Sequence, residues 1–423
     1  MGSGETSPTM VKTHRELLQR LGEAPVAVLL DTPFGFQANH DELASRAVEY
    51  FATSVGFEIG VATYRSAAAA SPLEYERMLA RLREADYVFA GPGSPSYALR
   101  QWAGSLVPKV LSEKLATGGA ITFASAAALT LGVVTVPVYE IYKVGEEPRW
   151  LDGLDLMAEA GLRVAVIPHY NNAEGGTHDT RFSYLGEHRL ARLERELPDG
   201  TFVLGVDEHT GLILDLDAGS ASVVGRGVVT IRLTGRSTEL PPGTEVGIDE
   251  LRGLGEHGAA ARPSTAVAPG RVATPGEPIA AETGTAGAGS PLATSPLLEA
   301  VQRYEDDFAA AVAGRRAEDA AAAVLALDDE LHAWRADTLQ SDELDRGRAA
   351  LRSMIVRLGE LAVAGARDPA EVIGPFVDEL LARRAAARAD HRYGEADAVR
   401  DRLTSLGVEV QDSPEGTRWR LLS

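Results

Sequence analysis

Cysteine is absent from this 423-residue chain, which excludes a disulfide framework, a cysteine nucleophile and any thiolate ligand for a metal. Positive charge is also in deficit, because 61 acidic residues outnumber 41 basic ones and leave a net charge of −20. Binding to DNA or to an anionic membrane needs a positive surface, so neither is expected as a partner. Scarce lysine beside abundant arginine and alanine is typical of GC-rich genomes, actinobacterial ones among them.

Long apolar runs are missing as well. No segment approaches the roughly 20 apolar residues of a membrane-spanning helix. The first residues, Met1 to Glu5, also lack the basic and apolar regions of a signal peptide. We therefore expect a cytoplasmic protein.

The apolar residues that are present make up 45% of the chain, enough for at least one large core and two or three domains. Short β-type runs alternate with helical stretches up to about residue 255. This alternation predicts an α/β domain over residues 1–255, with a mostly parallel sheet covered by helices. The β-type runs include 26–30, 87–90 and 164–167, the helical stretches include 41–55 and 72–84, and two paired runs, 211–217 and 223–233, predict a closing hairpin.

The composition changes after this domain. From Gly258 to Ser295 the residues are mostly Ala, Pro, Gly, Thr and Ser, which bury too little apolar surface to offset the entropy lost on ordering. We predict a flexible, disordered linker over residues 256–296. Residues 297–423 then have the period and the composition of helices and end in a short β-type segment. An all-α module with a small terminal hairpin is expected there.

A candidate nucleophile lies between residues 118 and 128. A short apolar strand runs into Ser125, which has small neighbours and is followed by a helix-forming alanine run. This pattern predicts a nucleophile elbow, a tight strand-to-helix turn that exposes the serine hydroxyl. The first N–H groups of the following helix, beginning with that of Ala126, would then point at a developing oxyanion.

A base and an acid are also available. His169 follows the apolar run 164–167, and Glu140 lies between Ser125 and His169 in the sequence. A serine hydroxyl needs a positioned imidazole as its base, and the imidazole needs a carboxylate to hold its tautomer. We predict a triad of Ser125, Glu140 and His169. Taken singly, Glu140 would more often be a solvated surface acid and His169 a capped strand end.

Four features of the sequence belong together here: the order serine, acid, histidine, the run Pro168-His169-Tyr170, the segment 177–181 and the loop Gly91-Pro92-Gly93-Ser94. In these features the chain resembles the dipeptidase E and cyanophycinase family of serine peptidases. The resemblance implies a class I glutamine amidotransferase-like fold without cofactor or metal. It implies that Ser125 is the nucleophile, His169 the general base and acid, and Glu140 the orienting carboxylate. It also implies an oxyanion hole built from Gly93, Ser94 and Ala126. A true glutamine amidotransferase is excluded, because that enzyme requires a cysteine nucleophile.

The chain departs from the family pattern next to the elbow, where Ala127 replaces the usual glycine. A methyl group there can crowd the turn, so an altered substrate, a slow enzyme or an inactive one are all open. Four residues after the histidine are expected to line the substrate cleft, and the resemblance implies that the arginine among them holds an acidic substrate. The alternative interpretation of this arginine is that it forms a surface ion pair. These four residues are Tyr170, Asn171, Asn172 and Arg181.

The loop Gly2 to Glu5 is rich in glycine and is expected to approach the active site. The strand that should precede it is missing. Either the domain lacks this strand or the true start lies upstream.

The C-terminal stretches 393–403 and 406–419 closely resemble the end of bacterial cysteinyl-tRNA synthetases, and the likeness extends over residues 375–421. The nucleotide-binding signatures of a synthetase and its cysteine zinc ligands are absent, so this chain cannot charge tRNA with cysteine. Binding of tRNA by this region stays open, because acidic residues interrupt its arginines and favour a salt-bridged, solvated face. Trp419 is expected to pack the hairpin onto the helices rather than to stack on a base. The arginines are Arg383, Arg384, Arg388, Arg392, Arg400 and Arg402.

The sequence as a whole favours a serine-type hydrolase that cleaves amide or peptide bonds of small substrates, aspartyl dipeptides among them, through an acyl-enzyme on Ser125. The alternative is a catalytically inactive adaptor that binds tRNA or a protein through its C-terminal module. A third hypothesis is a hydrolase of aminoacyl esters delivered by that module.

Overall fold

The computed structural model describes residues 1–175, 178–257, 295–314, 316–337, 343–365, 369–413 and 416–422. Of the predicted linker 256–296, residues 258–294 lie outside the described residues, while residues 256–257 end one helix and Pro296 begins another. The chain divides into two compact units, Met1–Glu299 with Asp329–Arg346, and Ala300–Asp328 with Gly347–Ser423. Among the described residues, no helix is long and apolar enough to cross a membrane.

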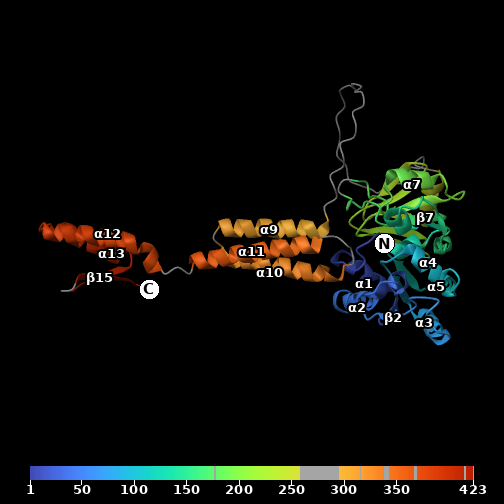
Figure 1. Ribbon diagram of the computed structural model, residues 1–423, viewed down its shortest axis with the longest axis horizontal. Helices are drawn as coiled ribbons and strands as arrows, with labels where there is room; N and C mark the ends of the chain where they lie inside the picture. Colours follow the sequence, from blue (N-terminus) through green and yellow to red (C-terminus); the bar gives the residue numbers. More distant parts are fainter. Residues whose placement is uncertain are drawn as a thin grey trace, which may run out of the picture. The chain divides into compact units, whose positions relative to one another are not determined.

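A four-stranded parallel sheet with the order β2-β1-β3-β4 forms the first half of unit 1 (Figure 1). All residues of β1 and β3 are buried and nearly all are apolar, as expected for central parallel strands covered on both faces. The α/β fold with helices covering a parallel sheet is therefore confirmed. The strands are β1 (Ala27–Leu30), β2 (Gly60–Ala62), β3 (Tyr87–Ala90) and β4 (Ala120–Phe123).

The second half of unit 1 contains two further sheets, with the orders β12-β11-β8-β7 and β13-β10-β9, and a short β5-β6 pair. In the first of these, β7 and β8 run parallel, and β11 and β12 add in antiparallel fashion. The strands are β5 (Val134–Thr135), β6 (Leu151–Asp152), β7 (Val164–Ile167), β8 (Phe202–Val206), β9 (Thr210–Asp215), β10 (Ser220–Gly225), β11 (Val229–Leu233), β12 (Arg236–Leu240) and β13 (Glu245–Gly247).

The predicted closing hairpin is confirmed for its first arm, since β9 pairs antiparallel with β10. The expected second arm, residues 223–233, is in fact two strands. Gly225 has a φ of +99°, and an added Cβ would lie 2.2 Å from the carbonyl oxygen of His209. Because only glycine fits this bend, the chain leaves the hairpin there and forms β11, which pairs with β8 in the other sheet.

The helices predicted over 41–55 and 72–84 are present. The second one, α3, begins with a capping box, in which the side chain of Ser71 accepts from the N–H of Glu74 and the Glu74 carboxylate accepts from the N–H of Ser71. The helices of residues 1–257 are α1 (Val11–Arg20), α2 (His40–Tyr50), α3 (Pro72–Glu84), α4 (Pro95–Trp102), α5 (Val107–Ala116), α6 (Ser125–Leu129), α7 (Gly186–Glu194) and α8 (Ile248–His257), with short turns η1 (Pro8–Met10), η2 (Thr32–Phe34), η3 (Phe51–Val55), η4 (Glu140–Val144) and η5 (Leu156–Ala160).

Part of the expected helical module packs within unit 1. The ring of Trp334 is buried edge-on against His209, with the ring centroids 5.4 Å apart. The hydroxyl of Thr6 donates to the carbonyl oxygen of Ala336 at 2.6 Å, and both residues are buried. The elements of this region are α9 (Pro296–Ala313), α10 (Ala317–Ala333), η6 (Trp334–Ala336) and α11 (Glu343–Gly365).

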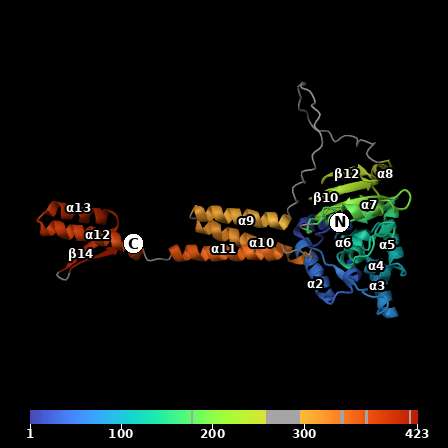
Figure 2. The same cartoon turned by 45° about the horizontal axis from the view of Figure 1, so that its top comes forward.

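The end of unit 2 has two helices, α12 (Pro369–Ala389) and α13 (Tyr393–Ser405), and a hairpin, β14 (Val408–Ser413) and β15 (Gly416–Leu421) (Figure 2). Trp419 packs against the apolar cluster that joins hairpin and helices, and its indole N–H donates to Asp378 at 2.9 Å. The prediction that this tryptophan packs the hairpin onto the helices is therefore confirmed.

We expect Gly205→Ala to lower the free energy of unfolding by about 1–3 kcal/mol, because an added methyl group overpacks a tight interior. The Cβ would lie 2.3 Å from the ring of Tyr170. Urea denaturation followed by circular dichroism measures the change. Gly60→Ala is the matched control, a strand glycine whose nearest atom would be 3.9 Å away. Equal midpoints for the two variants would contradict the packing argument.

Candidate active site

Ser125 stands where the sequence predicts it, at the turn from β4 into α6. Its φ is +50°, a left-handed conformation that costs a residue with a Cβ roughly 1–2 kcal/mol. Strain of this kind at a strand-to-helix turn is typical of a nucleophile elbow. The methyl group of Ala127 is accommodated, since Ala127 is fully buried in an apolar cluster and its N–H donates to the carbonyl oxygen of Gly91 at 3.1 Å.

His169 lies two residues beyond the end of β7 and also has a positive φ, +48°. Its Nε2 is 2.9 Å from the Oγ of Ser125. Its Nδ1 is 2.8 Å from the Oε1 of Glu208. The structure thus brings serine, imidazole and carboxylate into one hydrogen-bonded relay, in the order Ser125, His169, Glu208.

The predicted acid, Glu140, is not part of this relay, and the triad prediction is corrected at this position. Glu140 begins η4 and accepts a hydrogen bond from the hydroxyl of Ser96 at 2.5 Å. Glu208 takes the place at the imidazole because it lies two residues beyond the end of β8, and β8 pairs in parallel with β7. The carboxyl ends of parallel neighbours meet at the same edge of a sheet. The signal in the sequence was the apolar run 202–206 followed by two acidic residues.

Asn171 and Asn172, expected to line the substrate cleft, contact Glu208 instead. The side-chain oxygen of Asn171 accepts from the backbone N–H of Glu208 at 2.9 Å. The amide nitrogen of Asn172 donates to the Oε1 of Glu208 at 3.2 Å, and Asn172 is 1% exposed. Both asparagines therefore hold the carboxylate that holds the imidazole.

In the relay, the pKa of His169 is raised and the pKa of Glu208 is lowered. Burial lowers the pKa of His169, but the hydrogen bond and charge of Glu208, with smaller effects of Glu5 and Glu174, outweigh burial and raise it above 6.5. Burial raises the pKa of Glu208, but the hydrogen bond and charge of His169 and the hydrogen bond of Asn172 outweigh this and lower it. Glu208 is therefore ionised at neutral pH and stabilises a protonated imidazole, as a triad requires.

Of the three residues predicted to form the oxyanion hole, Ala126 and Gly93 stay predictions, and Ser94 is turned to other contacts. The N–H of Ala126 belongs to the first turn of α6, where N–H groups have no acceptor inside the helix. Gly93 has a φ of +138°, and an added Cβ would lie 2.0 Å from the carbonyl oxygen of Pro33, so only glycine fits there. Ser94 is corrected, because its N–H donates to Pro33 at 2.9 Å and its hydroxyl caps α4 by accepting from Tyr97.

The other two residues predicted to line the cleft, Tyr170 and Arg181, also contact neighbouring side chains. Tyr170 is 7% exposed, and its ring packs against Phe182 with centroids 4.4 Å apart. Arg181 donates from Nε and Nη2 to the carboxylate of Asp179, at 2.9 and 2.8 Å. The surface ion pair, which was the alternative for Arg181, is what the structure shows.

Two tyrosines that the sequence did not single out, Tyr184 and Tyr142, extend from the imidazole towards His178. The ring of Tyr184 is 6.5 Å from that of His169 and stacks on Tyr142 at 4.9 Å. The Tyr142 ring in turn stacks on His178. This aromatic cluster, Tyr142, His178 and Tyr184, is a stack of rings whose Tyr184 end lies next to the relay. Within the described part of the chain, no three His, Asp or Glu side chains are grouped to hold a metal ion.

We expect Glu208→Gln to lower the pKa of His169, because it removes the negative charge that raises this pKa. Glu140→Gln, the matched control, should leave it unchanged, since Glu140 bonds to Ser96. An NMR titration of the imidazole nitrogens in the three proteins measures the difference. An equal shift in both variants would argue against Glu208 as the partner of the imidazole.

Comparison with known proteins gives a match at the C-terminus, where residues 373–420 fit the family described as the cysteinyl-tRNA ligase anticodon binding domain. The cysteine–tRNA ligase of Salinibacter ruber is 58% identical over 43 residues, which cover 10% of this chain and 8% of that protein. The enzyme of Idiomarina loihiensis is 32% identical over 111 residues, 22% of this chain and 24% of that protein. The chain thus spans a small part of the curated relatives it matches.

Two solved structures are similar to the remainder of the chain. A peptidase from an acI-B1 Actinobacterium covers 58% of this chain and 94% of its own, with 20% identity and a TM-score of 0.48. A putative peptidase E protein from Listeria monocytogenes covers 57% and 96%, with 14% identity and a TM-score of 0.35. At its C-terminal end, over residues 373–420, the chain is therefore similar to the anticodon-binding domain of cysteine–tRNA ligases.

Proposed function

We propose that unit 1 hydrolyses amide or peptide bonds through an acyl-enzyme on Ser125. The observation that carries the proposal is the relay of two hydrogen bonds, 2.9 Å from Ser125 to His169 and 2.8 Å from His169 to Glu208. The left-handed turn at Ser125 supports it, because backbone strain is often found at functional residues such as a nucleophile.

In the first half of the reaction, the Oγ of Ser125 attacks the substrate carbonyl carbon while its proton passes to Nε2 of His169. The carbonyl π electrons move to oxygen, and in this proposal the N–H groups of Ala126 and Gly93 stabilise that oxyanion. When the tetrahedral intermediate collapses, the C–N bond breaks and His169 gives its proton to the leaving amine. Glu208 stays ionised throughout and stabilises the charged imidazole.

In the second half, water replaces the amine. His169 takes a proton from this water as its oxygen attacks the acyl carbon, and the proton returns to the Oγ of Ser125 when the ester bond breaks. A carboxylic acid leaves, and the free enzyme is restored. No cofactor enters either half.

The substrate we propose is a small peptide or amide with an apolar or aromatic group beside the scissile bond. The aromatic cluster places the ring of Tyr184 next to His169. Recognition of an aspartyl substrate by Arg181 is not supported, because Asp179 already occupies two donors of that guanidinium group.

We expect wild-type protein to react with a fluorophosphonate at Ser125, and Ser125→Ala to lose both this labelling and hydrolysis. Glu208→Gln should lower kcat by about 10³–10⁴ because the imidazole loses its orienting charge, whereas Glu140→Gln should change it little. Wild-type kcat/KM should rise with pH through the pKa of His169, because only the neutral imidazole accepts a proton. That pKa lies above 6.5, and the rise should move to lower pH in Glu208→Gln.

Mass spectrometry of the labelled peptide and assays on a panel of dipeptide amides give the measurements. Labelling at another serine, or none on the wild-type protein, would reject the acyl-enzyme and favour the inactive adaptor.

A second candidate function is binding of tRNA by the C-terminal end, and the observation that favours it is the family match over residues 373–420. Several arginines of this region form ion pairs with acidic side chains. Arg384 is 3% exposed and bonds to Asp412 with both terminal nitrogens, at 2.8 and 2.6 Å. Arg383 pairs with Glu379. On α13, by contrast, Arg400 and Arg402 are exposed.

If the full chain binds tRNA, Arg400→Ala with Arg402→Ala should weaken binding at low salt and reduce the salt slope by about 1–2, because each phosphate contact releases a counterion. Gel-shift titrations across salt concentrations measure this. Arg383→Ala is the control for the loss of a basic residue that is already paired. Absence of a shift with wild-type protein even at low salt would reject the proposal.

A further inference from the structure

The α10–α11 connection, residues 329–346, packs within unit 1, although the helices on either side of it continue in unit 2. Its described residues are 329–337 and 343–346. The hydroxyl of Thr6 donates to the carbonyl oxygen of Ala336, and Ala336 is buried in the apolar cluster that includes side chains of β1 and β3. Arg335 pairs with Glu49 of α2. The connection is therefore a built part of the α/β unit.

Trp334 is the largest side chain among the described residues of this connection. It is 2% exposed, and its indole N–H donates to Glu330, one turn earlier in α10, at 2.8 Å. Its ring meets the imidazole of His209 at an interplanar angle of 70°, with the centroids 5.4 Å apart. Aromatic rings favour this edge-to-face arrangement. The contact places the connection directly on the residue that follows Glu208 in the chain.

His209 is also held from other sides. Its Nδ1 lies 3.3 Å from the Oγ of Ser7 and 3.1 Å from the Oγ1 of Thr9. Its backbone is left-handed, with a φ of +53°, and its carbonyl oxygen accepts from the N–H of Arg226 at 3.0 Å. Burial lowers the pKa of His209 to about 4, so the ring is uncharged at neutral pH. His209 is thus fixed by hydrogen bonds and by packing, with Trp334 as its aromatic neighbour.

The position of His209 bears on the relay because the preceding residue is Glu208. A trans peptide bond holds neighbouring Cα atoms about 3.8 Å apart, so a shift of His209 moves the backbone of Glu208. The carboxylate of Glu208 meets Nδ1 of His169 at 2.8 Å, and such a hydrogen bond weakens steeply when its geometry is lost. A displacement at His209 is therefore expected to loosen the relay.

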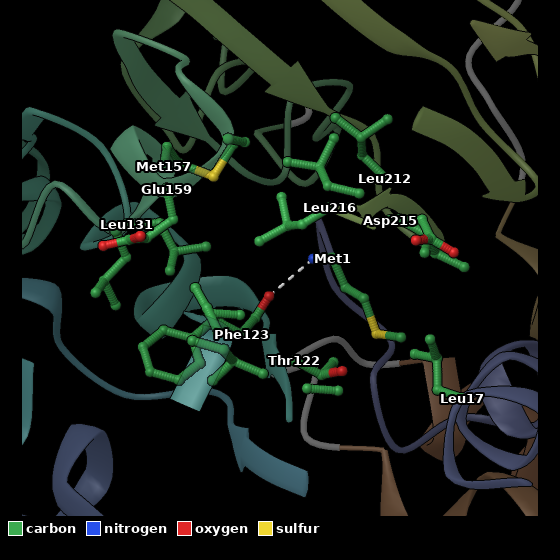
Figure 3. A pocket seen from close by; sticks show the side chains of 18 of the residues that line it. Met1, Leu17, Thr122, Phe123, Leu131, Met157, Glu159, Leu212, Asp215 and Leu216 are labelled. Carbon is green, nitrogen blue, oxygen red and sulfur yellow. Dashed lines mark hydrogen bonds between the residues drawn. The ribbon is translucent and has the colours of Figure 1, made fainter. Parts of the chain in front are cut away.

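The N-terminal segment links the same region to the nucleophile elbow. The Met1 nitrogen donates to the carbonyl oxygen of Phe123 at 2.8 Å (Figure 3), and the Met1 carbonyl accepts from the N–H of Ser125 at 3.3 Å. Further along this segment, Ser7 contacts the imidazole of His209. Residues 1–9 therefore run from the elbow to the ring on which the tryptophan packs.

The far end of the connection lies within electrostatic range of Glu208. Glu343, the first residue of α11, accepts a hydrogen bond from the hydroxyl of Ser295. Burial raises the pKa of Glu343, the bond from Ser295 lowers it, and the negative charges of Glu208 and Glu174 raise it. The connection thus comes near Glu208 at two points, Trp334 and Glu343.

We propose that Trp334 is a positioning residue for the relay. Its ring holds His209, His209 holds the backbone of Glu208, and Glu208 orients His169. Hydrolysis at Ser125 therefore requires that the α10–α11 connection is seated on unit 1. The inference rests on the function proposed above, and it makes a segment between two helices of the C-terminal region a support of the hydrolytic site.

The test compares three variants of the full chain. Trp334→Ala removes the ring, and Trp334→Phe keeps an aromatic ring beside His209. Leu82→Ala removes a fully buried side chain of α3 and is the control for a general loss of packing. An NMR titration of the imidazole nitrogens measures the pKa of His169. We expect this pKa to fall in Trp334→Ala, because a displaced Glu208 raises it less, and to keep its wild-type value in the other two variants.

Kinetics on an amide substrate give a second measurement. In Trp334→Ala, kcat should fall by about tenfold to a hundredfold with little change in KM, because a small misplacement of a catalytic group has an effect of this size. Fluorophosphonate labelling of Ser125 should slow as well. Trp334→Phe should restore both rates, and Leu82→Ala should leave them near the wild-type values. If circular dichroism shows that Trp334→Ala does not fold, Trp334→Leu, which keeps an apolar side chain, takes its place with the same expectation.

Two outcomes overturn the proposal. An unchanged pKa of His169 in Trp334→Ala assigns the tryptophan to stability alone, whether or not activity falls. An equal fall of this pKa in Leu82→Ala shows a general loosening of the unit.

Failure of the proposed function has a different signature. If the wild-type protein neither hydrolyses amides nor reacts with the fluorophosphonate, Ser125 is not a nucleophile. The titration of His169 needs no turnover, so it still decides whether Trp334 positions the relay.

Discussion

The parallel pairing of β7 with β8 is the constraint on which the candidate site depends. It brings the carboxyl ends of the two strands to one edge, so that His169 and Glu208, each two residues beyond its strand, meet at 2.8 Å. Asn171 and Asn172 then fix Glu208 from the loop that follows the histidine. Strand pairing thus places the imidazole, and the side chain of Glu208 orients it.

The pKa values of the acidic residues near His169 follow from the same placement of side chains. Glu208 is largely buried, yet its pKa is lowered, because the imidazole and the asparagine amide supply the hydrogen bonds that water would have given. A second carboxyl group, Glu5, is also buried near the relay, and burial raises its pKa. The surroundings of these two acids, both near His169, thus shift their pKa values in opposite directions. Glu208 has donors around it, whereas Oε1 of Glu5 has no hydrogen-bond partner in the described part of the chain.

Local signals in the sequence were enough to predict the parallel sheet, the elbow at Ser125 and the histidine at a strand end, because each depends on a short window of residues. The acid depended on which strands are neighbours, and nothing near Glu140 or Glu208 encodes that pairing. Ser94 was assigned a donor role that its contact with Pro33 excludes, and this contact joins segments about 60 residues apart in the chain. The three residues that directly follow the histidine are Tyr170, Asn171 and Asn172. The backbone turns at His169, which has a positive φ, and this turn directs their side chains into the protein.

The left-handed backbone at Ser125 and His169 has a consequence for the stability of the chain. Glycine at either position would relieve a conformational cost of roughly 1–2 kcal/mol, a large fraction of the margin by which proteins stay folded. At His169 this relief would be offset, because the exchange would also remove the hydrogen bonds of the imidazole to Ser125 and Glu208. The chain keeps both residues in these conformations, so each adds a conformational cost to folding that the packing and hydrogen bonds around it must offset.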